Sequence, residues 1–365
     1  MAAQTLHLGW HNPVRITWGC GAFNALQFAQ PMVLIADRGA LGGENEEFLR
    51  SMLGVACKSI AWFDGGLASV QRAKELCDRL WPVLAQYPEC LIVAVGGGST
   101  LDLAKAVRFR FSSDIAAEHV WRTNTLPTSF YRHPMWLIPT TAGTGSEVTP
   151  WATLWDTLAP NPKKLSWAPQ NGFAECAIID PDLSRTCPST LSRDCALDSL
   201  SHALESLWNI NRTPITETLA IEAARTVIAH LPALLESSEN HDAQTEIVRA
   251  SLLAGLAMSQ TRTALAHALS YQLTLEEHLP HGHAVAVWLP MVWEIAVKSN
   301  PSCQKSLGQI FAKSADFGVS EIIQWLSRIG IEPRDLRQTP SGRKILLAEL
   351  SSARGRNFAG NYLVD

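Results

Sequence analysis

A carboxylate and an imidazole stand four residues apart in the second half of the chain, at Asp198 and His202. Residues at this spacing in a helix lie on one face, one turn apart, so both can bind the same cation. His267 offers a third ligand, and a fourth comes from one of three clustered histidines, His278, His281 and His283. One aspartate with three imidazoles suits Fe(II) or Zn(II) better than Mg²⁺ or Ca²⁺, which prefer oxygen ligands. The residues alone leave the choice within the cluster open, and each histidine taken singly also fits a hydrogen-bonded core position.

A glycine-rich turn in the first half of the chain has the chemistry of a phosphate cradle. An apolar run ends in Gly96, Gly97, Gly98 and Ser99, and a helical pattern containing Asp102 follows. Glycines let the backbone approach a pyrophosphate, and a helix N-terminus offers N–H groups with partial positive charge. Ser99 can cap the helix or bind the phosphate. The turn lacks the GxGxxG spacing, so by itself it fits a tight strand–helix connection equally well.

A second loop, rich in small hydroxyl residues, strengthens the nucleotide interpretation. It follows another apolar run and contains Thr140, Thr141, Thr144 and Ser146. Two such loops after parallel strands favour a nucleotide site at the carboxyl edge of a sheet. Asp37 ends an earlier apolar run, where a carboxylate can accept hydrogen bonds from an adenosine ribose and repel a 2′-phosphate. Asp37 therefore favours NAD over NADP, and its alternative role is to cap a helix or turn.

Apolar runs alternate with helical patterns in the first half of the chain. Strands are expected over 14–18, 32–37, 56–63, 91–95, 136–140 and 177–180, and helices over 71–84 and 100–109. This alternation predicts buried parallel strands with crossover helices. We therefore expect an α/β, Rossmann-like dinucleotide-binding domain over residues 1–186.

Beyond residue 187 the periodicity is helical throughout. Helices are expected over 190–208, 215–235, 243–260, 264–275, 283–298, 304–315 and 320–328. Two prolines, Pro181 and Pro188, punctuate the transition. The sequence thus predicts an all-α C-terminal metal-binding domain over residues 187–365.

Composition excludes several function classes. The 365 residues are 47% hydrophobic and carry a net charge of −4 without a basic block, which argues against a nucleic acid partner. No apolar run approaches the ~18 residues needed to cross a bilayer, and the N-terminus lacks a signal pattern. We therefore expect a cytoplasmic protein without a membrane partner. Eight cysteines, none in a CxxC pair, are expected to be free thiols.

Five short motifs are informative as an ordered set. They are GGGSxxDxAK from Gly96, PTTAGTGSEV from Pro139, DxxxH from Asp198, HAxS from His267 and PHG from Pro280. Their order and spacing resemble the iron-dependent (group III) alcohol dehydrogenase family over nearly the whole chain. The resemblance implies a dehydroquinate synthase-like fold, a homodimer, and NAD(H) with Fe(II) or Zn(II) as cofactors. It also implies that metal and nicotinamide face each other across a cleft.

The resemblance also assigns roles to residues. It places metal binding on Asp198, His202, His267 and His281, and so selects His281 from its cluster. It places pyrophosphate binding on the Gly96–Ser99 turn with Asp102. The family pattern assigns the nicotinamide ribose side to Thr140, Thr141, Thr144 and Ser146, and the adenosine ribose to Asp37.

Three residues that differ from or add to the family pattern concern the reaction and its substrate. Tyr271 stands where many relatives have a histidine near the substrate, and a phenol with a pKa of ~10 is a poorer proton shuttle at neutral pH. Arg262 precedes His267 by five residues. We expect it about one helical turn from the metal, where a guanidinium suits a carboxylate or phosphonate. A salt bridge elsewhere is the alternative. Lys164, with Lys163, matches a family segment on the other side of the cleft and is expected to assist.

Together these residues predict the reduction of a small anionic aldehyde. The segments 261–271 and 148–153 look like the phosphonoacetaldehyde reductase branch of the family, which implies reduction of phosphonoacetaldehyde to 2-hydroxyethylphosphonate. One alternative is a family dehydrogenase that acts on neutral short-chain alcohols. A second is a lyase of the dehydroquinate synthase kind, which uses NAD only transiently. A third is a non-catalytic protein that binds NAD or metal.

Overall fold

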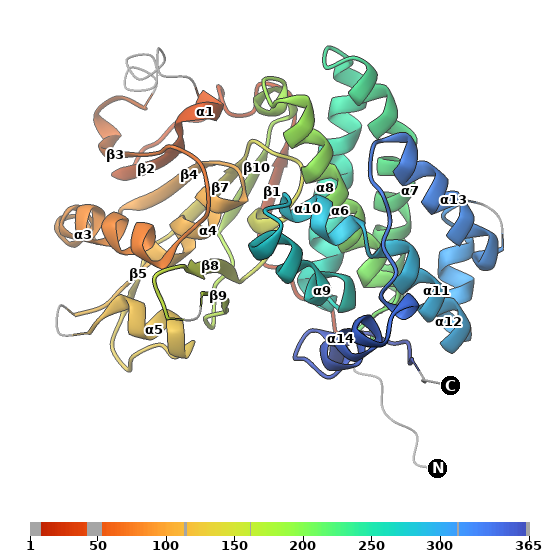
Figure 1. Cartoon of the computed structure of the whole chain (residues 1–365). Coiled ribbons are helices and arrows are strands. Elements are labelled where there is room, and N and C mark those ends of the chain that lie inside the picture. Colours follow the sequence, from red (N-terminus) through yellow and green to blue (C-terminus); the bar gives the residue numbers. More distant parts are fainter. Residues whose placement is uncertain (1–8, 42–52, 113–114, 161, 312–313, 363–365) are drawn as a thin grey trace. The chain divides into compact units, whose positions relative to one another are not determined.

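The computed structural model describes residues 9–41, 53–112, 115–160, 162–311 and 314–362 (Figure 1). The described residues divide into an N-terminal unit, Pro13–Cys187, and a helical unit that begins at Pro188, with which residues 9–12 are grouped. Residues 9–12 were expected in the first domain. They group with the helices because the backbone N–H of His11 donates to Gln260 Oε1 at 3.2 Å and Asn12 Nδ2 donates to Ser259 Oγ at 3.3 Å.

The N-terminal unit is built on a six-stranded sheet in which every pair of neighbouring strands is parallel. The strand order is β1-β10-β7-β4-β2-β3. The strands are β1 (Arg15–Trp18), β2 (Met32–Asp37), β3 (Cys57–Phe63), β4 (Leu91–Gly96), β7 (Met135–Pro139) and β10 (Cys176–Ile179). All six lie within two residues of the predicted runs. The predicted α/β class is therefore confirmed.

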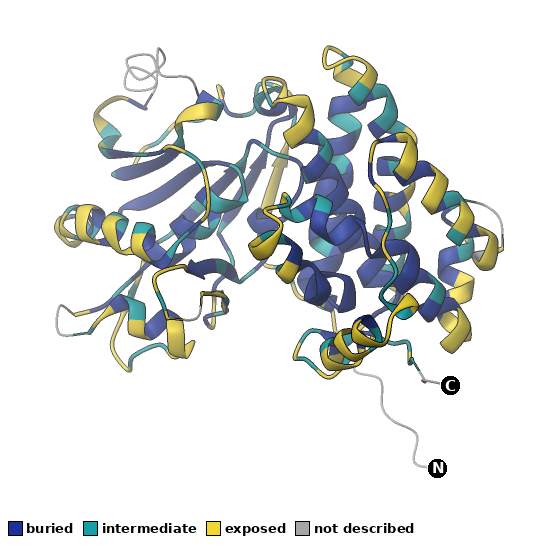
Figure 2. Ribbon diagram, in the orientation of Figure 1, coloured by how far each residue is buried: buried dark blue, intermediate teal, exposed yellow. Residues whose placement is uncertain are grey.

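Alternate residues of β2 enter different cores. Val33 and Ile35 belong to one buried cluster, whereas Met32, Leu34 and Ala36 belong to another. Because side chains of a strand alternate between faces, the sheet is covered on both sides. This double burial explains why the central strands read as unbroken apolar runs rather than as alternating patterns (Figure 2).

Helices and two small hairpins complete the N-terminal unit. The helices α3 (Val70–Gln86) and α4 (Gly98–Val107) lie where they were predicted, and the Ser69 hydroxyl caps α3 by accepting from the Arg72 N–H. Further elements were not predicted: α1 (Arg38–Leu41), α5 (Ala117–Thr123), the pair β5 (Phe109–Arg110) and β6 (Tyr131–Arg132), and the antiparallel pair β8 (Ala152–Asp156) and β9 (Lys163–Trp167).

The described residues beyond Cys187 form helices without a strand, which confirms the predicted helical domain. The helices are α6 (Ser189–Leu207), α7 (Pro214–Glu236), α8 (His241–Thr261), α9 (Leu265–Glu276), α10 (His281–Ala286), α11 (Leu289–Ser299), α12 (Pro301–Gly308), α13 (Ala315–Arg328) and α14 (Pro340–Leu350). The single helix expected over 283–298 is wrong, because the chain breaks between α10 and α11. Pro290 occupies the first turn of α11, where its missing N–H costs no hydrogen bond.

The helix α7 is long and apolar enough to cross a membrane by length and composition. In the helical unit it packs against α6 and α8, and its buried residues include Ala220, Ala223 and Val227. This packing accounts for its apolar character as a core helix.

Candidate active site

Three imidazole nitrogens surround one carboxylate oxygen in the helical unit. Nε2 atoms lie 3.3 Å (His267), 3.5 Å (His202) and 4.0 Å (His281) from Oδ1 of Asp198. Asp198 and His202 share one face of α6, as their spacing predicts, whereas His267 comes from α9 and His281 is the first residue of α10. The ligand atoms of Asp198, His267 and His281 lie within 4.8 Å of one another, a spacing that suits a metal ion.

The donor chemistry fits a transition metal. Burial by itself would raise the pKa of Asp198, but the imidazoles of His202, His281 and His267 hold that pKa well below its usual range. The site therefore keeps an ionised carboxylate against three nitrogen donors, which is a set suited to Fe(II) or Zn(II).

A glycine brings the third histidine to this site. A Cβ atom on Gly282 would stand 1.8 Å from the backbone oxygen of Asp194, so only glycine lets α10 lie directly against α6. His281, the preceding residue, thereby reaches Asp198. His278 is exposed, and neither His278 nor His283 belongs to the group of potential ligands formed by Asp198, His267 and His281.

Glu205 is the residue at this site that the sequence reasoning missed. It is fully buried on α6, and its Oε2 atom lies 2.7 Å from Nδ1 of His267. It also accepts the backbone N–H of Ala264 at 2.7 Å and that of His267 at 3.2 Å. Burial would raise the pKa of Glu205, but His267 and these N–H groups hold it below its usual value. An ionised Glu205 keeps a proton on Nδ1 and leaves Nε2 of His267 available to a metal.

Tyr271 lies beside the metal cluster, one helical turn after His267. Its ring is stacked on that of His281, with centroids 6.4 Å apart and planes 16° apart. Burial raises the pKa of Tyr271 to about 12, although the nearby Arg354 acts in the opposite direction. The phenol therefore keeps its proton across the physiological range, which makes it a poor proton shuttle.

The continuous helical spacing expected between Arg262 and His267 is not formed. The helix α8 ends at Thr261 and α9 begins at Leu265, so Arg262 belongs to the connection between them rather than to the helix of His267. Its φ angle is +66° and its side chain is exposed. Asn209 Nδ2 donates to its carbonyl at 3.1 Å, and this contact helps hold the unusual backbone.

In the N-terminal unit the two predicted loops meet at the carboxyl ends of β4 and β7. Gly96 pairs with Pro139, and the Thr140 N–H donates to the Gly96 carbonyl at 3.0 Å. A Cβ on Gly97 would stand 3.3 Å from Thr141 Oγ1, and one on Gly98 would stand 2.4 Å from Thr144 Cγ2. The glycines thus allow the hydroxyl-rich loop to pack directly on the turn, in addition to any role toward phosphate.

The start of α4 remains suited to an anion. Gly97 precedes α4 without a side-chain cap, so no side chain competes for the N–H groups of the first turn. Ser99 lies within that first turn rather than at the cap. Asp37 ends the neighbouring strand, and its Cβ would stand 2.9 Å from a Cβ on Gly96. Its Oδ1 also accepts the Ala40 N–H at 3.1 Å, which is the turn-capping role weighed as an alternative.

Asp102 and Ser146 bind each other. The Ser146 hydroxyl donates to Asp102 Oδ1 at 2.6 Å, and the Thr153 N–H donates to Oδ2 at 2.7 Å. Lys105 is buried beside them and donates to Ser146 Oγ and to the Trp151 carbonyl, each at 2.7 Å. These contacts tie α4 to the second loop. They indicate that Asp102 and Ser146 position the two loops, and that Lys105, which the sequence reasoning did not single out, is the centre of this network.

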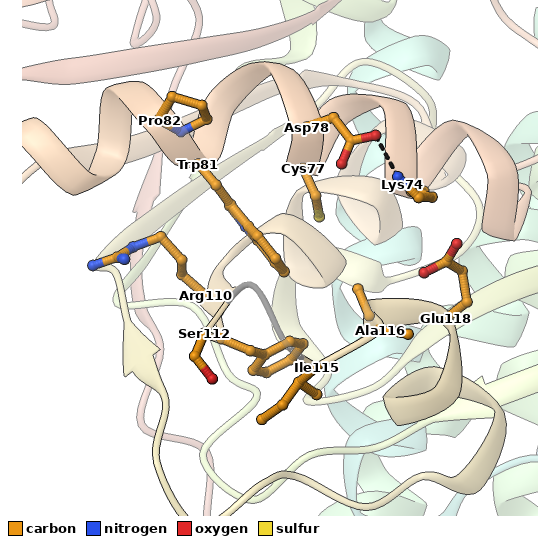
Figure 3. A pocket seen from close by; sticks show the side chains of 12 residues that line it. Lys74, Cys77, Asp78, Trp81, Pro82, Arg110, Ser112, Ile115, Ala116 and Glu118 are labelled. Atoms are coloured by element: carbon orange, nitrogen blue, oxygen red, sulfur yellow. Dashed lines mark hydrogen bonds and ion pairs between the residues drawn. The ribbon is translucent and has the colours of Figure 1, made fainter.

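The last predicted residue, Lys164, lies on β9, where its ammonium stands 5.5 Å from the Trp155 ring centroid. A separate pocket in this unit is lined by residues of α3 and of the segment around α5, including Cys77, Trp81, Phe111 and Ile115 (Figure 3). The Lys74–Asp78 ion pair lies at its margin. None of its lining residues belongs to the predicted cofactor or metal sets.

Comparison with known proteins gives matches over both units. Residues 13–181 match the profile described as iron-containing alcohol dehydrogenase, and residues 193–332 match the C-terminal profile of the Fe-containing alcohol dehydrogenase family. The probable alcohol dehydrogenase EutG of Salmonella typhimurium is 31% identical over 288 residues, which cover 73% of this chain and 72% of that protein.

Two further similarities concern a sulfonated aldehyde. The sulfoacetaldehyde reductase of Bilophila wadsworthia is 32% identical over 58% of this chain and 54% of its own length. The match to several curated relatives likewise spans less than two thirds of their length. The crystal structure of sulfoacetaldehyde reductase from Bifidobacterium kashiwanohense in complex with NAD+ superposes with a TM-score of 0.84 at 25% identity, covering 96% of this chain and 94% of that one.

Proposed function

Because the chain belongs to the iron-containing alcohol dehydrogenase family, we propose that it is an NAD(H)- and iron-dependent enzyme that interconverts an aldehyde and its alcohol. The observation that carries the proposal is the Asp198 carboxylate, which three imidazole nitrogens approach within 3.3–4.0 Å. When bound, the two cofactors supply a Lewis acid for the carbonyl oxygen and a hydride donor for the carbonyl carbon.

The residues of this chain hold and orient these groups. Asp198, His202, His267 and His281 provide the metal ligands. Glu205 fixes the tautomer of His267. In the N-terminal unit, the uncapped start of α4 is suited to the pyrophosphate, and Asp37 is suited to an adenosine ribose without a 2′-phosphate. NAD(H) is therefore the proposed coenzyme rather than NADP(H).

Reduction of an aldehyde also consumes a proton. Tyr271 is placed beside His281, but burial holds its pKa near 12. A phenol with that pKa cannot turn over quickly as a neutral-pH proton donor and acceptor. We infer that the proton comes from water or from a ribose hydroxyl, and that Tyr271 contributes shape and hydrogen bonding instead.

For the substrate we propose a small anionic aldehyde, with phosphonoacetaldehyde reduced to 2-hydroxyethylphosphonate as the leading case. The similarity to sulfoacetaldehyde reductases supports the class, because a sulfonate and a phosphonate are both tetrahedral oxyanions. Neutral short-chain alcohols are the second candidate, since a relative named as an alcohol dehydrogenase is about as similar as the sulfoacetaldehyde reductase. A cytoplasmic homodimer completes the proposal and rests on the family resemblance.

A substrate panel tests this proposal. The Fe(II)-loaded enzyme is assayed for loss of NADH absorbance with phosphonoacetaldehyde, sulfoacetaldehyde and propanal. We expect NADH consumption, with higher kcat/KM for an anionic aldehyde. Higher kcat/KM for propanal would favour the neutral-alcohol alternative. Product formation without net NADH consumption would favour a lyase of the dehydroquinate synthase kind, and absence of turnover with every substrate would contradict the enzymatic proposal.

A further inference from the structure

A partly buried arginine stands over Tyr271. Arg354 lies between α14 and the short helix η6 (Gly355–Asn357), and its guanidinium carbon is 5.4 Å from the centroid of the Tyr271 ring. Its Nη1 atom donates to the Thr263 hydroxyl. Cation–π contact and this hydrogen bond hold the guanidinium over the ring. Among the described residues, no carboxylate forms an ion pair with Arg354, in contrast to Arg108, Arg249 and Arg337.

The backbone fixes this arginine at the start of α9. The Asn357 side chain donates to the Thr263 carbonyl at 2.8 Å, and so anchors η6 to the connection between α8 and α9. A Cβ on Gly355 would stand 1.9 Å from the Glu349 oxygen, so the chain turns tightly immediately after Arg354. Both features fix the backbone beside Arg354 within the helical unit that contains the metal cluster.

Tyr271 contacts both this guanidinium and one of the metal-cluster histidines. The Tyr271 ring is stacked on that of His281, with centroids 6.4 Å apart, and its centroid lies 5.4 Å from the guanidinium carbon of Arg354. Two-carbon aldehydes with a terminal oxyanion need a positive group within a few ångströms of the carbonyl. Of the arginines described, Arg354 is tied through Tyr271 to a metal ligand, whereas Arg262 is an exposed residue outside the helix of His267.

We propose that Arg354 binds the anionic group of the substrate and thereby determines specificity for small sulfonated or phosphonated aldehydes. One of its five N–H groups is used by Thr263, which leaves others that can meet a tetrahedral oxyanion in a bidentate manner. The ring of Tyr271 holds the guanidinium in place. This role accounts for an aromatic residue at position 271, where the high pKa of the phenol makes it a poor proton relay. This inference rests on the proposed aldehyde reduction.

Steady-state kinetics on the Fe(II)-loaded enzyme with NADH provides the first test. We compare Arg354→Gln with Arg356→Gln, a matched control whose side chain is exposed and donates to the Ser351 carbonyl at 2.9 Å. Loss of charge-assisted hydrogen bonds should lower the ratio of kcat/KM for the anionic aldehyde to that for propanal on the order of 10- to 100-fold, mainly through KM. Arg356→Gln should leave the ratio unchanged, and Arg354→Lys should restore part of it.

Equilibrium binding separates this inference from the proposed function. Ethanesulfonate and ethylphosphonate are titrated calorimetrically into the wild-type enzyme and into Arg354→Gln, and the tighter ligand identifies the preferred oxyanion. Weaker anion binding in the variant supports the inference even if no aldehyde tested is reduced, which would count against the proposed function alone. Equal anion affinity, or an unchanged specificity ratio in an active variant, overturns the role of Arg354. If Arg354→Gln does not fold, Arg354→Lys and Thr263→Val carry the same comparison.

Discussion

Glu205 Oε2 lies 2.7 Å from Nδ1 of His267, and both side chains are buried. Such a carboxylate orients the imidazole and raises its basicity as a ligand. We predict that Glu205→Gln weakens Fe(II) or Zn(II) binding by about 10–100-fold, measured by competition with a chromophoric chelator. Glu236→Gln, an exposed change at the end of α7, should not alter affinity. Equal affinity in Glu205→Gln and wild type would show that Glu205 serves folding only.

Metal binding should also stabilise the helical unit. A ligand that binds only the folded state raises stability by about 2.7 kcal/mol at a free concentration 100 times its Kd. We therefore expect Fe(II) to raise the Tm of the wild-type protein and chelation to reverse the change. In His281→Ala the shift should be much smaller, because one nitrogen donor is lost. An equal rise in Tm for both proteins would place the metal elsewhere.

Coenzyme choice should depend on Asp37. Replacing this carboxylate with Ser removes the charge that would repel a 2′-phosphate and removes an acceptor for the ribose. We predict that Asp37→Ser lowers kcat/KM for NADH and raises it for NADPH, so that the ratio falls at least about tenfold, as the loss of one charge-assisted contact implies. A ratio that stays constant would leave Asp37 with its turn-capping role through the Ala40 N–H alone.

The free energy of unfolding should depend on pH through Glu147, which is buried in the second loop of the N-terminal unit. Burial raises its pKa to about 7 from an ordinary value of 4.5. Between these values the unfolded chain releases a proton that the folded protein keeps, so the contribution of Glu147 becomes less favourable as pH rises from about 4.5 to 7. Glu147→Gln should therefore gain stability relative to wild type as pH rises through this window, measured as the Tm difference at pH 5 and pH 8. A constant difference would contradict the assignment.

The backbone conformation of Arg262 leads to a separate prediction about stability. Its φ of +66° lies in a region that disfavours side chains, and glycine adopts it without that penalty. We predict that Arg262→Gly raises the free energy of unfolding by about 1 kcal/mol, whereas Arg262→Ala does not. Urea denaturation of both variants checks this. A loss of stability in Arg262→Gly would mean that the side chain contributes contacts that exceed the strain.

The sequence was most informative where one physical rule dominates. β2 was predicted with the observed bounds, Met32–Asp37, because a strand buried on both faces reads as a continuous apolar run. The face shared by Asp198 and His202 followed from helical spacing alone. The selection of His281 came from family resemblance, and the structure supplies a physical reason in Gly282, whose missing Cβ lets α10 approach α6.

Other features depend on contacts that the local pattern does not encode. Arg262 was placed by helical arithmetic from His267, but the chain leaves α8 at Thr261 and starts α9 only at Leu265. Glu205 had a usable signal, because it follows His202 by three residues and so lies on the ligand face of α6. Its role depends on the hydrogen bonds that it accepts from the start of α9, which tertiary packing forms and helical spacing does not predict. Arg354 lies far along the chain from Tyr271, and only tertiary structure brings them together.

The most direct measurement follows deuterium into the product from NADH that carries deuterium at both C4 positions. The metal-free protein is loaded with Fe(II), mixed with the labelled coenzyme and an aldehyde of the panel, and the alcohol is analysed by mass spectrometry. We predict one deuterium on the former carbonyl carbon, with formation abolished by chelation, restored by Fe(II), and lost in Asp198→Asn. Labelled product formed equally well by the chelated protein or by Asp198→Asn would contradict the assignment of this cluster as the catalytic metal centre.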